Sequence, residues 1–514
     1  MKSINLFLVL ILFIPITVFS QSIESNEYNR NSIAIITVKN KKWNKEIVSA
    51  SSNYDYSKFD INEIDSKELK LDGLSPNGDR AKFIDSLVEN SDLGKEVISY
   101  WFGRKANGEM NVDRVAKRAV YNANDADYDN SIASKRGTAM IEDMGFDLVK
   151  SSYIFVIDNP RIEYSRKNKS YDINSVLYVF RVEYTQEIEA SIFETWINES
   201  DTPKVRDHKN KCFNNIKIPL KLVYTTKNAS SSSDINLAFK YIYDGLFYNL
   251  EKDMESMAVG SYIENVNPIT AKIGTKEGLK NGRRYFAYKY KEGRDGELKK
   301  VKKGVLRATV IADNKNTDLG KTPESSFYQI AGGTLREGYS ILQKNDIALG
   351  VSLGYRYGGY EGYALKFDKL LSINKSGGSN YLLFDFTGNY YTHIKPLSEN
   401  KSYFTSVSVE VGYGYGIRFA RIFEIMPIIK FGADMLFDTQ EEDKELNQGY
   451  AYMVMPELRL NMNLAYPLQF MVGVDYGIPF AYEKNYKEIL DYVETSKGRK
   501  RKGMGLSAGL KYIF

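Results

Sequence analysis

The chain ends on the stretch GMGLSAGLKYIF, residues 503–514, in which two kinds of side chain alternate. One face carries apolar and aromatic residues, namely Met504, Leu506, Ala508, Leu510, Tyr512 and Phe514. The other face carries mainly small residues, namely Gly503, Gly505, Ser507, Gly509 and Lys511, with Ile513 as an apolar exception. Alternation with a period of two predicts a strand between two different environments. Small inward residues and an apolar outer stripe are typical of a narrow β-barrel surrounded by lipid.

The aromatic residues at the end of this strand also carry a family resemblance. With Tyr512 two positions before a terminal Phe514, the stretch resembles the C-terminal insertion signal of bacterial outer-membrane proteins. The resemblance implies that Gly505, Gly509, Tyr512 and Phe514 belong to a signal that the barrel insertion machinery recognises.

Seven further segments of similar length and alternation precede this strand. They are residues 346–357, 360–371, 380–394, 403–416, 422–437, 450–464 and 468–480. Eight strands form the smallest common closed barrel, whose interior is filled by side chains. We therefore predict a C-terminal eight-stranded antiparallel transmembrane β-barrel over residues 343–514, with outer-membrane lipid around it.

The positions opposite the apolar stripe carry charges of both signs. They are Arg356, Lys366, Asp368, Asp385, Glu410, Lys430, Asp434, Glu457, Arg459, Asp475 and Lys511. A closed lumen can satisfy such charges as ion pairs, whereas a soluble β-sandwich would place them in water. A soluble secreted or periplasmic binding protein with a C-terminal β-sandwich remains an alternative interpretation.

The N-terminus predicts export from the cytoplasm. Residues 1–20 combine one basic residue, an apolar run over 6–19 and small residues before a cleavage site after Ser20, which is typical of a signal peptide. Later apolar runs are shorter than the roughly 18 residues that a transmembrane helix needs. The net charge of +5 is spread along the chain and predicts no nucleic-acid partner. The single cysteine, Cys212, excludes an internal disulfide framework.

Residues 21–260 lack the barrel pattern and predict a periplasmic α+β region. The expected strands cover 32–38, 153–164, 176–197 and 216–225, the expected helices 80–101, 132–149 and 235–258, and 225–234 is expected to be a polar loop. Such a region outside the barrel predicts an unidentified periplasmic protein partner.

Residues 261–342 predict a separate, small SH3-like β module. Strands are expected at both ends of 267–290 and within 304–314 and 327–342, and Gly274, Gly278 and Gly282 suit positive-φ turns. The stretches IGTKEGLKNGRRYFAY, GVLRATVIADN and REGYSI resemble the C-terminal domain of the flagellar assembly protein FlgT. This resemblance implies a periplasmic docking or assembly fold without catalytic residues. The whole layout is similar to that of Bacteroidota outer-membrane proteins.

Histidine is scarce, which weighs against most enzymatic and metal chemistry. The only two are His208, in a charged stretch expected to be a loop, and His393, at the outer end of a barrel strand. Nucleophilic triads and most zinc sites need a partnered histidine, so we predict no catalytic, cofactor or metal site. The alternative is a lipid-modifying barrel enzyme that uses His393 with Ser398 and Glu399.

The run KGRKRK, residues 497–502, is the densest cluster of charge. Counting strands outward from the periplasm places the connection 481–502 outside the cell. Lys497, Arg499, Lys500, Arg501 and Lys502 could therefore contact lipopolysaccharide phosphates, or simply form a solvated loop. Together these features predict a non-enzymatic outer-membrane protein whose barrel anchors a periplasmic interaction or assembly region.

Overall fold

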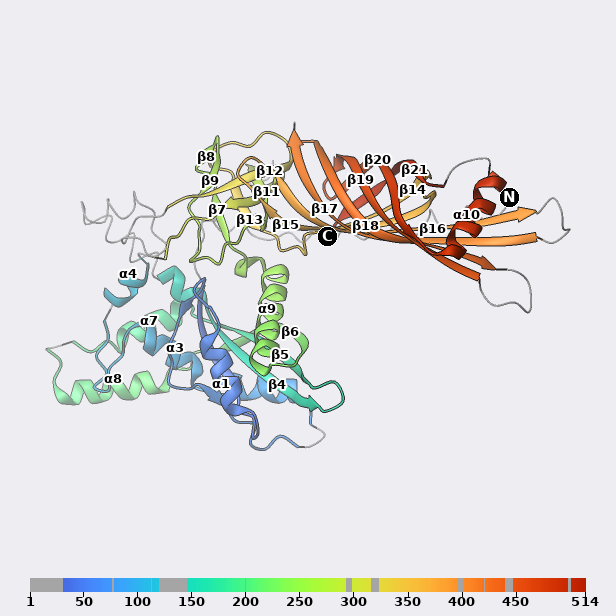
Figure 1. Cartoon of the computed structure of the whole chain (residues 1–514). Helices are drawn as coiled ribbons and strands as arrows, with labels where there is room; N and C mark the ends of the chain where they lie inside the picture. Colours follow the sequence, from blue (N-terminus) through green and yellow to red (C-terminus); the bar gives the residue numbers. More distant parts are fainter. Residues whose placement is uncertain are drawn as a thin grey trace.

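The computed structural model describes residues 31–75, 78–111, 113–119, 146–198, 200–292, 298–315, 323–394, 401–419, 421–439, 447–497 and 501–514. Three units follow one another along the chain: an α+β domain, a β module and a closed barrel (Figure 1). The expected signal peptide lies outside the described residues.

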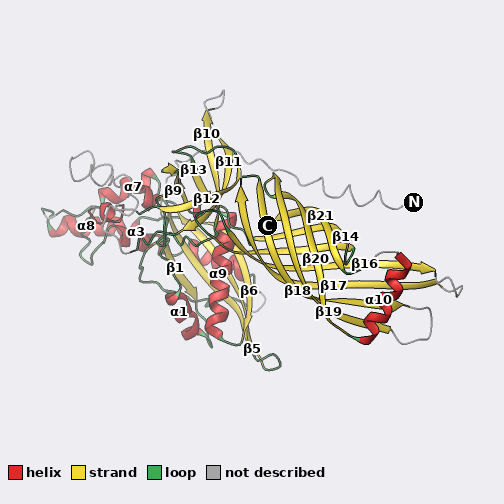
Figure 2. Cartoon of the chain, turned by 45° about the horizontal axis from the view of Figure 1, so that its top comes forward, coloured by secondary structure: helices red, strands yellow, loops and turns green. Residues whose placement is uncertain are grey.

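The α+β domain is built around one mixed sheet with helices on both faces (Figure 2). Its strands are β1 (Ser32–Val38), β2 (Asp60–Ile61), β3 (Glu68–Leu69), β4 (Ser152–Ser165), β5 (Ser170–Val182) and β6 (Leu220–Ser232), in the order β2-β1-β4-β5-β6 with β3 beside β1. Its helices are α1 (Asn44–Asn53), α2 (Arg80–Glu89), α3 (Leu93–Trp101), α4 (Asp113–Ala119), α7 (Gln186–Glu194), α8 (Pro203–Asn215) and α9 (Ile235–Asp253), followed by a 3-10 turn at Glu255–Met257.

Alternation along the central strands divides the core of this domain in two. Ile154 and Val156 of β4 pack with α2 and α3, whereas Phe155 and Ile157 pack with α1 and α9. A strand buried on both faces needs apolar residues at every position, and Tyr153–Ile157 is apolar and buried throughout.

Several boundaries in this domain differ from the sequence prediction. The strand expected over 176–197 ends at Val182, and α7 follows it because the hydroxyl of Thr185 accepts from the amide of Ile188 and caps the helix. The loop expected over 225–234 is wrong up to Ser232, since β6 continues there by pairing Ser232 with Tyr171. The helix expected over 80–101 is interrupted between α2 and α3. His208 lies in α8, not in a loop. Of the helix expected over 132–149, only residues 146–149 are described, and they are helical.

The β module is one antiparallel sheet with the order β7-β13-β10-β11-β12-β9-β8. The strands are β7 (Gly260–Tyr262), β8 (Asn265–Val266), β9 (Ile269–Ala271), β10 (Arg284–Glu292), β11 (Leu298–Val310), β12 (Ser325–Gly332) and β13 (Ser340–Gln343). Because β7 and β8 are nearly continuous in sequence, one bent segment forms both edges of the sheet. These strands lie between Gly260 and Gln343, and the SH3-like classification stays a prediction.

The turn glycines of this module have two different roles. Gly278 and Gly282 adopt φ of 69° and 81°, as the sequence predicts. Gly274 does not adopt a positive φ, and a Cβ there would lie 2.4 Å from the carbonyl oxygen of Ala312. The prediction for Gly274 is therefore wrong about its backbone, and the residue is small because another chain segment passes close by.

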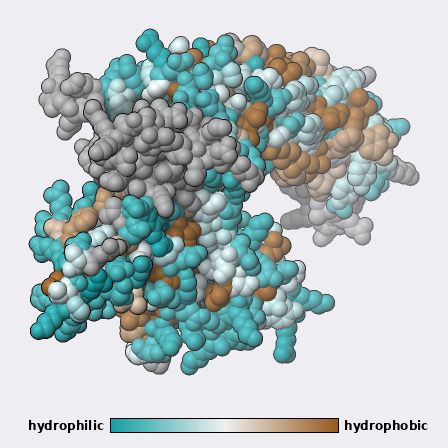
Figure 3. Space-filling view, turned by 90° about the vertical axis from the view of Figure 1, so that its left-hand side faces the viewer, coloured by the Kyte–Doolittle hydropathy of each residue, from teal (hydrophilic) through white to brown (hydrophobic). Residues whose placement is uncertain are grey.

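The C-terminal unit is a closed barrel of eight antiparallel strands, as the sequence predicts. They are β14 (Leu349–Gly358), β15 (Gly362–Ile373), β16 (Ser379–Ile394), β17 (Lys401–Phe419), β18 (Phe423–Thr439), β19 (Asn447–Ala465), β20 (Leu468–Tyr482) and β21 (Gly503–Ile513). The final strand closes the barrel against the first, from Gly350 opposite Ile513 to Gly358 opposite Gly505. Apolar side chains gather over the barrel, whereas the surface of the α+β domain is mostly hydrophilic (Figure 3).

The connection 481–502 contains a helix, α10 (Lys484–Lys497), which the sequence analysis does not predict. Tyr486, Ile489 and Leu490 are buried against Leu436 of β18 and Ala451 of β19. The helix forms because this apolar face covers the barrel end that lies away from the β module, here called the far end (Figure 1).

The β module packs against the opposite end of the barrel, here called the module end. Arg307 of β11 donates to both carboxylate oxygens of Asp346, and the Asn281 amide both donates to and accepts from the backbone of Ile373 in β15. Phe286 and Tyr466 meet edge to face with ring centroids 6.0 Å apart. The boundary predicted near residue 342 is thus a packed junction.

We expect a fragment of residues 21–346 to be soluble and to unfold cooperatively, because the α+β domain and β module have their own cores. A fragment ending at residue 339 is the matched control. It lacks β13, which pairs with β7 and β10 and buries Ile341 and Leu342, and should aggregate or melt at lower temperature. Thermal unfolding by circular dichroism distinguishes them, and equal stability would contradict the assigned role of β13.

Candidate functional site

The lumen of the barrel holds a dense network of buried charges. All eleven charged positions that the sequence places inward are buried. Their strands alternate between an outward apolar and an inward polar residue, and the final strand does so from Met504 to Tyr512. The inward assignment from the sequence is therefore confirmed.

Two cations organise the centre of this network. Lys430 Nζ lies 2.9 Å from Asp385, 2.7 Å from Glu410 and 2.9 Å from Glu457. Arg459 contacts both Glu457 and Asp368 at 2.8 Å. Each cation thus joins carboxylates from different strands, and the pairs tie opposite walls of the barrel together.

The rest of the network completes the pairing. Lys366 lies 3.1 Å from Glu457, and Lys511 lies 2.6 Å from Asp368. Arg356 contacts Asp475 and lies 3.5 Å from Glu410. The central network therefore contains five cations (Arg356, Lys366, Lys430, Arg459 and Lys511) and five carboxylates (Asp368, Asp385, Glu410, Glu457 and Asp475), and its net charge is zero. Neutrality offsets the high cost of burying isolated charges.

The far end of the lumen is closed around Asp434, mainly by side chains from outside the strands. Asp434 accepts from Arg501 at 2.8 and 3.0 Å, from the Tyr486 hydroxyl at 2.7 Å and from Ser408 at 2.6 Å. Tyr360, after β14, is also buried there, beneath the guanidinium of Arg501. Together with α10, these side chains fill the far end.

This arrangement corrects one part of the proposed lipopolysaccharide site. Arg501 is 5% exposed and points into the barrel, so it is not available to a lipid phosphate. Lys502 is exposed. Lys497 ends α10 but its side chain is not described, and Arg499 and Lys500 lie outside the described residues.

A second polar group lies at the module end. Glu424 contacts Arg418 at 2.7 Å and accepts from the Tyr381 hydroxyl at 3.0 Å and from Asn461 at 3.1 Å. Strand parity could have identified Arg418 and Glu424, since they share the inward parity of Glu410 and Lys430. Tyr381 likewise shares the inward parity of Asp385 on β16.

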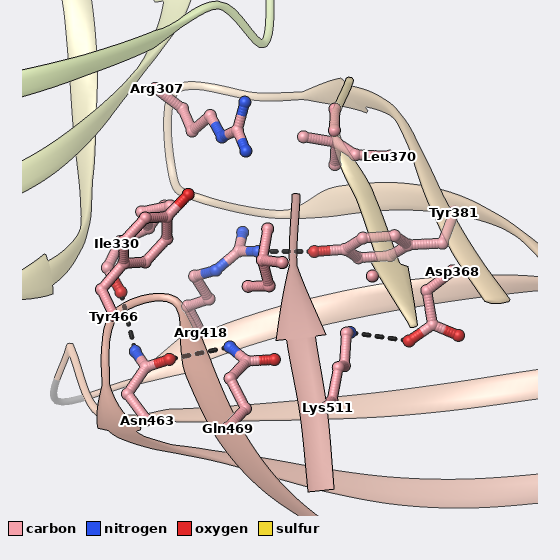
Figure 4. Close-up of a pocket in the computed structure, with 13 residues that line it drawn as sticks. Arg307, Ile330, Asp368, Leu370, Tyr381, Arg418, Asn463, Tyr466, Gln469 and Lys511 are labelled. Atoms are coloured by element: carbon pink, nitrogen blue, oxygen red, sulfur yellow. Dashed lines mark hydrogen bonds and ion pairs between the residues drawn. The ribbon is translucent and has the colours of Figure 1, made fainter. Parts of the chain in front are cut away.

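A small cavity of about 30 Å³ separates this group from the β module (Figure 4). Lys511 and its partner Asp368 line it from the barrel, and Arg307 and Ile330 line it from the module. Asn463 donates to the carbonyl oxygen of Ile330 at 2.9 Å, which joins the two units beside the cavity. A volume of this size holds only a few water molecules.

The four residues of the expected insertion signal lie on the closing strand. Tyr512 and Phe514 are 45% and 50% exposed on the outer surface, with ring centroids 4.7 Å apart. Gly505 and Gly509 face inward, where there is no space for a side chain. A Cβ at Gly505 would lie 2.5 Å from the Asp475 carboxylate, and one at Gly509 would lie 2.5 Å from the carbonyl oxygen of Leu353.

The residues of the alternative enzyme reading are only partly placed. His393 is near the end of β16, opposite Ser402 in the strand register, and its side chain is not described. Ser398 and Glu399 lie outside the described residues. Within the described ranges, no group of three or more His, Cys, Asp or Glu residues could hold a metal ion. No helix among the described residues has the length and hydropathy to cross a membrane.

The barrel is similar to solved outer-membrane proteins. Similar structures are the N-terminal β-barrel domain of Pseudomonas aeruginosa OprF (9% identity, TM-score 0.20, 33% of this chain and 98% of that one) and Ail, the attachment invasion locus protein of Yersinia pestis (13%, 0.20, 32% and 95%). A major outer membrane protein from Thermus thermophilus matches at 13% identity and a TM-score of 0.23, over 32% of this chain and all of that one. No protein-family model and no curated protein matches the chain significantly. At such identities and TM-scores, function must be inferred from the side chains themselves.

Proposed function

We propose that this protein is a non-enzymatic outer-membrane protein, in which a closed barrel anchors an interaction or assembly region in the periplasm. The observation that carries the proposal is the combination of an apolar exterior with a lumen full of paired charges. Exposed apolar side chains circle the barrel, among them Leu353, Tyr363, Phe431, Leu458 and Phe480. Lipid surroundings account for that exterior, because water would penalise an apolar surface of this extent.

The closed lumen favours an anchor over a channel. Lys430 and Arg459 occupy its centre, Tyr486 and Arg501 fill the far end, and the β module covers the other end. A barrel of eight strands encloses little more than its own side chains. No continuous water path is therefore expected, and the function is assigned to the parts outside the barrel.

The lengths of the connections support a periplasmic position for the N-terminal region. Two tight turns, 421–422 and 466–467, lie at the module end, whereas the connection between β20 and β21, which contains α10, lies at the far end. The short turn 359–361 at the far end is an exception. Short periplasmic turns and longer external loops are usual in outer-membrane barrels. The module end, with the α+β domain beside it, then faces the periplasm and an unidentified protein partner.

Several finer assignments belong to the same proposal. Residues 1–20 direct export, and the insertion machinery recognises the closing strand through Tyr512 and Phe514. Lys497, Arg499, Lys500 and Lys502 contact lipopolysaccharide at the far end, without Arg501. The β module is a docking fold of the SH3-like kind that resembles the FlgT domain, and the layout is similar to that of Bacteroidota outer-membrane proteins.

We expect the full chain, expressed in a Gram-negative host, to fractionate with the outer membrane and to migrate faster on gels when unheated than when boiled. The closed barrel resists detergent, which produces the shift. Purified protein in planar bilayers should show no steady ion conductance. Recovery in the soluble periplasmic fraction would contradict the location, and stable open channels would contradict the closed lumen.

A further inference from the structure

The turn between β4 and β5 concentrates positive charge on an exposed tip. Arg166, Lys167 and Lys169 are exposed within four consecutive positions. Among the described residues, none of these three side chains forms an ion pair, whereas the nearby Glu163 is already paired with Arg161 at 2.8 Å. The tip therefore presents three cations to its surroundings.

The backbone of this turn is strained at one of these cations. Lys169 adopts a φ of 50°, a conformation that glycine or asparagine adopts more easily. Residues held in such conformations often serve a function that outweighs the local cost. A lysine at this point adds charge to the tip where a neutral residue would suit the backbone better.

An exposed aromatic side chain stands directly beside the charges. Tyr164 is 47% exposed, and its ring lies 4.9 Å from that of Tyr171 on the neighbouring strand. Tyr171 in turn packs edge to face against Trp43, with ring centroids 5.9 Å apart. Tyrosine favours the boundary between lipid and water, so this fixed ring and the cations form an amphipathic tip.

The hairpin points toward the plane where the barrel would enter the membrane. In Figure 1 the turn between β4 and β5, at the lower centre, extends toward the barrel side of the picture about as far as the C-terminus does. The exposed rings of Tyr512 and Phe514 mark that level on the barrel wall.

We propose that the tip of the β4–β5 hairpin binds anionic phospholipid headgroups on the periplasmic leaflet and gives the α+β domain a second attachment to the membrane. The inference rests on the proposed outer-membrane orientation. Lipid is favoured over a protein partner because the tip lies at the membrane level and combines cations with an interfacial tyrosine. The attachment would fix the orientation in which the α+β domain meets its periplasmic partner.

The test uses the full chain in lipid nanodiscs, with Cys212→Ser as background. A fluorophore at Asn168→Cys reports contact with lipids that carry a quencher on the headgroup. The matched control is the same label at Lys204→Cys, an exposed position in α8 on the side of the domain away from the barrel (Figure 1). Discs contain phosphatidylcholine alone or with one third phosphatidylglycerol.

We expect quenching at position 168 in the discs with phosphatidylglycerol, a loss of most of it without phosphatidylglycerol, and little at position 204 in either. The combined change Arg166→Gln, Lys167→Gln and Lys169→Gln should remove the lipid-dependent part. The unheated gel shift of the same samples reports insertion of the barrel separately. A missing shift would count against the proposed function. A normal shift with no quenching at 168, or with quenching equal in both lipid mixtures, would overturn the headgroup contact.

Discussion

Replacement of Arg356 with methionine is expected to lower the free energy of unfolding of the barrel by about 3–5 kcal/mol, because it leaves a buried charge without its partner. Asp475 on β20 is 2% exposed and contacts Arg356 on β14, the strand on the other side of β21. Its only ion pair among the described residues is with Arg356. The midpoint of urea unfolding in detergent, followed by the unheated gel band, measures the effect.

The matched control removes both charges of this pair. Arg356→Met with Asp475→Asn leaves four cations and four carboxylates in the central network, so neutrality is restored and most of the lost stability should return. Glu410 keeps Lys430 as a partner at 2.7 Å in both variants. A single variant with the wild-type midpoint, or a double variant as unstable as the single one, would show that the pairing does not stabilise the barrel.

The barrel could be predicted from the sequence because its two environments impose a strict period of two. A shift of the strand register by one residue would turn every apolar side chain into the lumen. The pattern therefore indicates both where a strand lies and which of its side chains face inward. For the same reason the sequence identifies inward charges such as Lys430 and Glu457. It does not identify their partners, since the contact between Arg356 on β14 and Asp475 on β20 depends on how the barrel closes.

The parts that could not be predicted depend on distant contacts. Helix α10 contains many charged residues, and the described side chains that it buries, Tyr486, Ile489 and Leu490, pack on Leu436 of β18 and Ala451 of β19, which lie far away in the sequence. Arg501 is indistinguishable in sequence from its basic neighbours, yet Asp434 binds it inside the lumen. The outer half of β6 is rich in serine and threonine, and pairing with β5 rather than composition makes it a strand.

The change Tyr512→Asp is expected to reduce the folded, membrane-inserted fraction sharply, as is deletion of Phe514. Both side chains lie on the outer surface of the strand that closes the barrel, and the Phe514 amide donates to the carbonyl oxygen of Leu349 at 2.9 Å. An incompletely closed seam leaves backbone groups unpaired in lipid, at several kcal/mol each. The measurement is the amount of heat-modifiable band in outer-membrane preparations.

Leu464→Asp separates a specific signal from a general loss of apolar surface. Leu464 lies near the module end of β19, outside the closing strand. Its exposed fraction of 51% is similar to the 45% of Tyr512. If the terminal aromatics are recognised during insertion, Leu464→Asp should leave most of the band and Tyr512→Phe nearly all of it. If Leu464→Asp and Tyr512→Asp lose the same amount of band, the loss in Tyr512→Asp reflects only a loss of lipid contact and not of a specific signal. Wild-type amounts after both Tyr512→Asp and deletion of Phe514 would show that the end of the chain is needed neither for closure nor for insertion.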